Sequence, residues 1–99
     1  MPAYAIFIRE GEVFNEDAMA AYQNRNREKA PPVAVKPLVV YGKMEVLEGD
    51  APDGIVVLEF ANMEDARKWY FSEEYQEAAK LRKLAANYRA ILVEGFSPG

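Results

Sequence analysis

The sequence contains no cysteine and no histidine. Without cysteine there can be no disulfide bonds, thiolate zinc sites or cysteine nucleophiles. Without histidine there can be no histidine metal ligands, histidine general bases or catalytic triads that depend on histidine. Glycine-rich phosphate loops and Walker sequences are missing as well. We therefore expect no cofactor, and an enzyme built on this chain would have to use carboxylates, tyrosine, lysine or arginine.

Positive charge and long apolar runs are also scarce. The chain has 12 basic and 16 acidic residues and a formal net charge of −4. This balance argues against non-specific binding to nucleic acids, which requires basic surface. The N-terminus lacks the pattern of a signal peptide, and no apolar stretch approaches the ~20 residues that span a bilayer. We expect a cytoplasmic protein without nucleic-acid or membrane partners.

The residues that are present suit one small globular domain. Of the 99 residues, 51% are hydrophobic and 12% aromatic, which supplies enough apolar surface for a core. We expect one domain over residues 1–96, with 97–99 as a flexible tail.

The patterning predicts an α+β fold with the order β-α-β-β-α-β. Short β-branched and aromatic runs indicate strands, and capped amphipathic stretches indicate helices. This order is typical of the split βαβ, ferredoxin-like sheet, which is antiparallel and carries its helices on one face. The second and third strands should pair as an antiparallel hairpin, and Gly42 should mark a bulge. Strands are expected at 3–10, 37–49, 55–61 and 88–96, and helices at 16–29, 63–71 and 73–86.

The third strand predicts a second copy of the chain. Alternation places Val56, Leu58 and Phe60 toward the helices. The opposite face is too apolar to be left in water, so another copy should cover it through a two-fold axis. We expect a homodimer through this open sheet face, with the two sheets forming a barrel-like core. The residues on that face are Ile55, Val57, Glu59 and Ala61.

Three segments together resemble the DUF1330 family of small bacterial proteins. They are "YGKMEVLEGD", "VVLEFANMEDARKWYFSEEYQEAAKLR" and "ILVEG". The resemblance covers nearly the whole chain and is strongest over residues 45–82. It implies a dimeric α+β barrel on a ferredoxin-like fold and no particular activity, because the family's molecular function is not established. The segment "VAVKPLVVYGK" lacks the Arg-Gly-Gly-like residues common there in the family, so no ligand role carries over to it.

Glu59 is the best candidate for a catalytic residue. It is a lone carboxylate on an apolar strand face. Burial raises the pKa of a carboxyl group and can fit it for proton transfer. Alternatively, Glu59 fixes the packing of the sheet by pairing with Arg82, Arg89 or Arg9.

Two arginines and three aromatic residues are candidates for ligand binding. Arg82 and Arg89 could bind an anion, because guanidinium groups match carboxylates and phosphates, or they could pair with internal acids. Trp69, Tyr70 and Tyr75 could line a pocket or belong to the core. Ser72, between them, predicts a helix break, because its hydroxyl can cap a new helix at residue 73. A metal site is not expected, because the acids near the hairpin lack ligand spacing. These acids are Glu45, Glu48, Asp50 and Asp53.

The sequence leaves two functional hypotheses open. The first is a homodimeric domain that binds a small molecule in a cleft between sheet and helices. The alternative is a cofactor-independent, isomerase- or monooxygenase-like enzyme that acts on a small organic acid or aromatic compound. Its machinery would be Glu59 as base, Arg82 as anion clamp, and Tyr70 or Tyr75 as proton donor.

Overall fold

The computed structural model of the protein describes residues 1–28 and 30–96. The predicted tail and the last residue of the first predicted helix lie outside this part. The predicted α+β order is confirmed, with the second helical region divided in two as the sequence indicated. The elements are β1 (Ala3–Arg9), α1 (Glu16–Glu28), β2 (Lys36–Val40), β3 (Gly54–Phe60), α2 (Met63–Tyr70), α3 (Glu73–Ala85) and β4 (Tyr88–Glu94).

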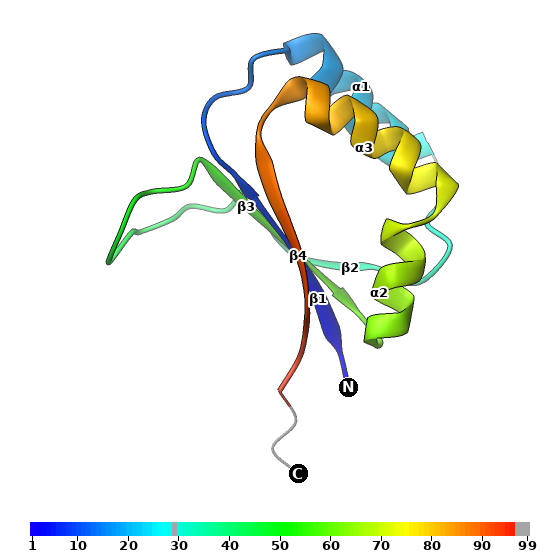
Figure 1. The fold of residues 1–99 in the computed structure, drawn as a ribbon. Helices are drawn as coiled ribbons and strands as arrows, with labels where there is room; N and C mark the ends of the chain where they lie inside the picture. Colours follow the sequence, from blue (N-terminus) through cyan, green and yellow to red (C-terminus); the bar gives the residue numbers. More distant parts are fainter. Residues whose placement is uncertain (29, 97–99) are drawn as a thin grey trace.

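The four strands form one sheet in the order β2-β3-β1-β4, and every neighbouring pair is antiparallel. Because β3 lies between β1 and β2, this is the predicted split βαβ arrangement. The helices cover one face of the sheet, with α1 and α3 side by side (Figure 1). No helix in the described part of the chain is long and apolar enough to cross a membrane.

The main core lies between the middle of the sheet and α2, together with the first half of α3. Ala3, Ala5 and Phe7 alternate along β1 and are buried toward the helices. The small side chains of Ala3 and Ala5 let α2 approach closely, and Trp69 meets the Phe7 ring edge-on at a centroid distance of 6.1 Å. By contrast, α1 and α3 pack chiefly against each other. The space between these two helices and the sheet is therefore bridged by side chains rather than by close backbone contact.

Side-chain caps begin all three helices. Asn15, Asn62 and Ser72 each accept a hydrogen bond from the backbone N–H three residues further on, at 3.0, 2.7 and 3.2 Å. Each cap satisfies a donor that the first helical turn leaves without a partner. The Ser72 hydroxyl also donates to the carbonyl oxygen of Trp69 at 2.7 Å. The predicted break between α2 and α3 is thus confirmed.

The second strand is much shorter than predicted. It ends at Val40, because Tyr41 adopts a left-handed conformation with a φ of 52°. The irregularity in its pairing with β3 lies between Pro37 and Val39, not at Gly42. The predicted antiparallel pairing of β2 and β3 is confirmed, but the connection between them is longer than expected, because the predicted strand over 37–49 ends at Val40.

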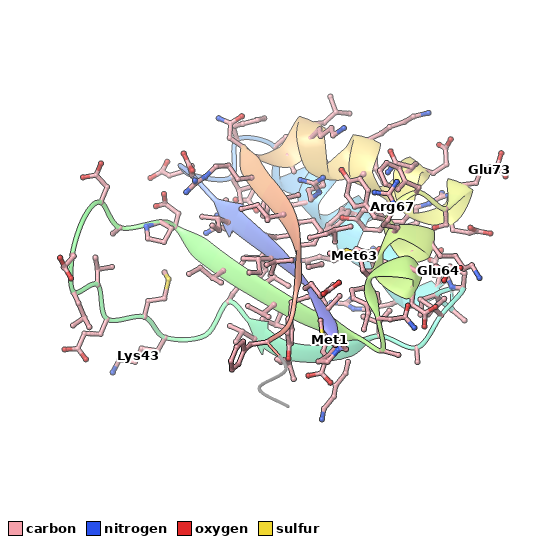
Figure 2. The ribbon with its side chains drawn as sticks, turned by 60° about the horizontal axis from the view of Figure 1, so that its bottom comes forward. Met1, Lys43, Met63, Glu64, Arg67 and Glu73 are labelled. Atoms are coloured by element: carbon pink, nitrogen blue, oxygen red, sulfur yellow. The ribbon has the colours of Figure 1, made fainter. Side chains whose placement is uncertain are left out.

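Residues 41–53 instead form a loop that projects from the body of the domain, with Lys43 far out on it (Figure 2). Backbone hydrogen bonds hold both ends of the loop, from Tyr41 N to Ile55 O at 2.9 Å and from Asp53 N to Arg9 O at 2.8 Å. Between these anchors the apolar side chains that favoured a longer strand are exposed. They belong to Met44, Val46 and Leu47.

The face of the sheet opposite the helices is apolar, as the alternation predicted. Ile6 of β1 lies between Val57 of β3 and Ile91 of β4 at its centre. Within the described chain no helix covers this face (Figure 1). Its other apolar members are Tyr4, Ile8, Val39, Ile55 and Val93.

Candidate functional site

A cavity of about 470 Å³ lies between the sheet and the helices α1 and α3. Phe7, Val56 and Leu58 form its floor on the sheet, and Trp69 of α2 closes one side. Its size is within the range of about 300–1,000 Å³ that is usual for small-molecule pockets. None of the described residues that line it is acidic. The remaining lining residues are Tyr22, Gln23, Asn26, Arg27, Pro37, Val40, Tyr41, Arg82 and Tyr88.

Arg82 is the most unusual side chain in this cavity. Only 3% of its surface is exposed, and its Nε has no hydrogen-bond partner among the described residues. No described carboxylate lies within ion-pairing distance of it. Its guanidinium carbon lies 5.2 Å from the ring centroid of Phe7 and 5.3 Å from that of Tyr88. The faces of these rings attract the positive charge of Arg82, but they do not accept hydrogen bonds from the N–H groups that point outward in the plane of the guanidinium.

Two pairs of tyrosine hydroxyls flank the cavity. The hydroxyls of Tyr22 and Tyr75 lie 3.1 Å apart, and those of Tyr41 and Tyr88 lie 2.6 Å apart. Burial, followed by the neighbouring Tyr22, raises the pKa of Tyr75, while the Arg82 charge works in the opposite direction. Burial and the hydrogen bond to Tyr88 likewise raise the pKa of Tyr41. Both phenols therefore stay protonated at neutral pH and serve as neutral donors and acceptors.

The predicted aromatic residues divide between core and cavity. Trp69 belongs to both, because it is mostly buried and also lines the cavity. Tyr75 stacks on it at a centroid distance of 4.1 Å and lines a smaller adjoining cavity of about 270 Å³ that Ser72 also borders. Tyr70 lines neither of these cavities. Its ring centroid lies 5.5 Å from that of Tyr75 and 6.3 Å from that of Trp69, and it borders a separate hollow of about 350 Å³ together with Arg82.

Glu59 and Arg89 lie on the opposite face of the sheet from Arg82. Glu59 stands across from Tyr4 in β1 and Lys36 in β2. Among the residues described, it makes no ion pair with an arginine.

Arg89 stands across from Ile8 and forms an ion pair with Glu10. Arg9, another possible partner for Glu59, donates instead to the carbonyl oxygen of Asp53 at 3.0 Å. One chain therefore does not bring the proposed base, Glu59, together with the proposed anion clamp, Arg82.

The acidic residues of the 41–53 loop do not form a metal centre in the described structure. No group of three suitable ligands occurs anywhere in residues 1–28 and 30–96. Asp53 has a structural role, because its Oδ2 accepts a hydrogen bond from the backbone N–H of Gly11 at 2.6 Å. This bond ties the end of the loop to the segment that follows β1.

Sequence reasoning missed the polar wall of the cavity, which α1 and the sheet edges supply. Tyr22 lies inside the predicted first helix and Tyr88 begins the predicted fourth strand, and neither position carries a signal of a binding site. For Tyr41, the sequence carries one local sign of its position, which is Gly54. A Cβ on Gly54 would come within 2.6 Å of the Tyr41 ring, so the ring packs against a position where only glycine leaves room.

Comparison with known proteins identifies the family and the fold. The family described as "Domain of unknown function (DUF1330)" matches residues 2–96. No curated protein matches the sequence. Several solved structures do, and the three described next are less than 20% identical, so they support the fold alone.

The methylated RPA0582 protein of Rhodopseudomonas palustris is 19% identical, with a TM-score of 0.66 over 99% of this chain and 83% of that one. A dimeric protein of unknown function and ferredoxin-like fold from Bacteroides fragilis is 13% identical, with a TM-score of 0.57 over 95% and 96%. An ethyl tert-butyl ether d (ethd) family protein from Bacillus halodurans is 13% identical, with a TM-score of 0.63 over 97% and 100%.

Proposed function

This chain belongs to the DUF1330 family, whose domains have no known function, and we propose a function for it from the shape of its cavity. The protein binds a small molecule between the sheet and helices α1 and α3. The observation that carries this proposal is the cavity of about 470 Å³ with an apolar floor and a polar wall. A few polar groups set into a mostly apolar pocket are the usual design of a ligand site.

The arrangement of the helices supports this proposal. The close packing of α1 against α3, rather than against the sheet, keeps the cavity open. The cavity opens to solvent beside Asn26, Arg27 and Val40, which are exposed, so a small molecule can enter it. A ligand that filled it would supply the contacts that the floor residues lack.

Trp69 provides a direct test of binding. It is the only tryptophan of the sequence and it lines the cavity. A thermal-shift screen of small carboxylates, amides, alcohols and aromatic compounds should find molecules that raise the melting temperature and change the Trp69 fluorescence. Val56→Phe, which fills the floor of the cavity, should abolish both effects.

Leu84→Phe is the matched control, because Leu84 lies on α3 with 60% of its surface exposed. This variant should bind as the wild type does. If no class of compound binds at millimolar concentration, or if Val56→Phe leaves binding unchanged, the proposed function is wrong.

We also propose that the protein works as a homodimer through the open sheet face. The support is the apolar surface centred on Ile6, Val57 and Ile91, which a second copy would bury. The Bacteroides fragilis structure of similar fold is described as dimeric. Glu59, with Lys36 beside it, would then lie at the interface rather than in the cavity of its own chain.

A further inference from the structure

We propose that the ligand is a small organic monocarboxylate and that the Arg82 guanidinium binds its carboxylate group. This inference rests on the proposed function, since it names the class of molecule that the cavity takes. Three features of the cavity lead to it: its charge, the free edge of one guanidinium group, and its apolar floor.

The charge of the cavity is positive although the protein is acidic. The chain has a formal net charge of −4, yet the described lining residues include Arg27 and Arg82 and no acid. Guanidinium groups stay charged inside proteins, and an isolated buried charge is strongly disfavoured. A bound anion would supply the counter-charge that the described chain does not provide.

The Tyr75 hydroxyl is a polar neighbour of the Arg82 guanidinium, but no described carboxylate pairs with it, so part of the guanidinium edge is available to a ligand. The ring centroids of Phe7 and Tyr88 lie 5.2 and 5.3 Å from the guanidinium carbon. These rings position the guanidinium, but they do not accept hydrogen bonds from its in-plane N–H groups. A carboxylate matches two parallel N–H groups of a guanidinium and is the usual bidentate partner. Arg27 is exposed and donates to Asn24 at 3.3 Å, so its role is to attract the anion at the mouth.

The floor of the cavity selects for a ligand with an apolar body. Phe7, Val56 and Leu58 offer only carbon surface there, so the part of the ligand that lies on them should carry no oxygen-rich groups. A phosphate group would need more donors than one buried arginine provides, and the sequence has no glycine-rich phosphate loop. A branched or aromatic monocarboxylate satisfies both the arginine and the floor.

The experiment compares each carboxylate with its neutral amide. Benzoate and benzamide, 3-methylbutanoate and 3-methylbutanamide, and phenyl phosphate are titrated into the full-length protein and followed by Trp69 fluorescence. Loss of one partner from a buried charge pair commonly weakens binding by 2 kcal/mol or more, which is about 30-fold. At least one carboxylate should therefore bind about 30-fold more tightly than its amide.

Variants then assign the effect to one residue. Arg82→Met should remove the preference for carboxylate over amide, and Arg82→Lys should keep part of it. Lys83→Met is the matched control and should keep all of it, because Lys83 is exposed on the same helix and does not line the cavity. If Arg82→Met does not fold, the carboxylate–amide comparison in the wild type decides the matter alone.

Each outcome separates the two proposals. Amides that bind as tightly as the carboxylates would overturn the carboxylate assignment and leave the small-molecule site standing. Phenyl phosphate binding more tightly than benzoate would overturn it in favour of a phosphate ligand. Absence of binding by every probe, charged or neutral, would overturn the proposed function itself.

Discussion

Replacing Arg82 with methionine should make the ligand-free protein more stable. Arg82 is 97% buried and its Nε has no partner within the described residues. A buried polar group without a partner costs about 1–3 kcal/mol, and a charged one costs more. The cation–π contacts to Phe7 and Tyr88 return about 0.5–2 kcal/mol each.

Methionine has a similar unbranched stem and forms favourable contacts of its own with aromatic rings, worth about 0.3–1.5 kcal/mol. It therefore recovers part of the lost ring contacts while it removes the unpaired charge. These ranges largely offset each other, and because a buried charge costs more than a neutral group we expect a net gain of up to about 2 kcal/mol in the free energy of unfolding. For a domain of this size, each kcal/mol should raise the melting temperature by about 4–8 °C.

Urea unfolding followed by Trp69 fluorescence measures this gain. Wild type and variant must be compared at the same protein concentration, because a dimer gains apparent stability with concentration. Lys83→Met is the control, since Lys83 is exposed on the same helix and the substitution should change stability by no more than about 0.5 kcal/mol. A loss of 3 kcal/mol or more in Arg82→Met is what breaking a buried ion pair produces, and it would refute the view that Arg82 is held for a ligand.

Three further predictions concern the helix break, the open face and the tyrosines. Ser72→Ala should lower the free energy of unfolding by about 0.5–2 kcal/mol in urea, because the α3 cap is lost; an unchanged value contradicts that role. Ile6→Glu should halve the mass measured by light scattering, whereas an unchanged mass counts against the proposed interface. The pKa values of Tyr41 and Tyr75 are raised above 10.0, so the unfolded chain releases these protons first and stability should fall as the pH rises above about 10. Urea unfolding between about pH 9 and 11 should show this fall, with a shallower slope in Tyr75→Phe.

The sequence predicted the fold well because its signals are local and agree with one another. Asn15, Asn62 and Ser72 mark the beginnings of the helices, and alternation along the third strand separates Phe60 from Glu59. Caps and alternation depend on neighbours within a few residues, so one sequence is enough to recognise them.

The second strand shows where such local signals fail. Met44, Val46 and Leu47 have the side chains of a strand, but no other strand of the described chain lies beside them. Strand propensity measures how well a side chain fits a pleated, half-buried surface, and the loop does not offer that surface. The left-handed Tyr41 ends the pairing first.

The candidate site was predicted only in part for a similar reason. Arg82, Trp69 and Tyr75 stand out as residue types on a helical face, and the structure places them at the two adjoining cavities. The cavities themselves depend on how far α1 and α3 stand from the sheet, which is a property of the whole domain. The alternation of side chains along the third strand placed Glu59 on the face of the sheet away from the helices. The separation of Glu59 from Arg82, the proposed anion clamp, therefore follows from the sequence pattern.

The position of β1 also bears on how the protein is made. This strand lies between β3 and β4, so it has no neighbour on one side until β3 forms and none on the other until β4 forms. A ribosome adds about 5–20 residues each second, so the first strand waits several seconds for its second partner. During that wait its edge is open to other nascent chains. The sheet can be completed only after Glu94 has emerged from the ribosome. The pairing of β4 with β1 is therefore the step that completes the fold of the nascent chain.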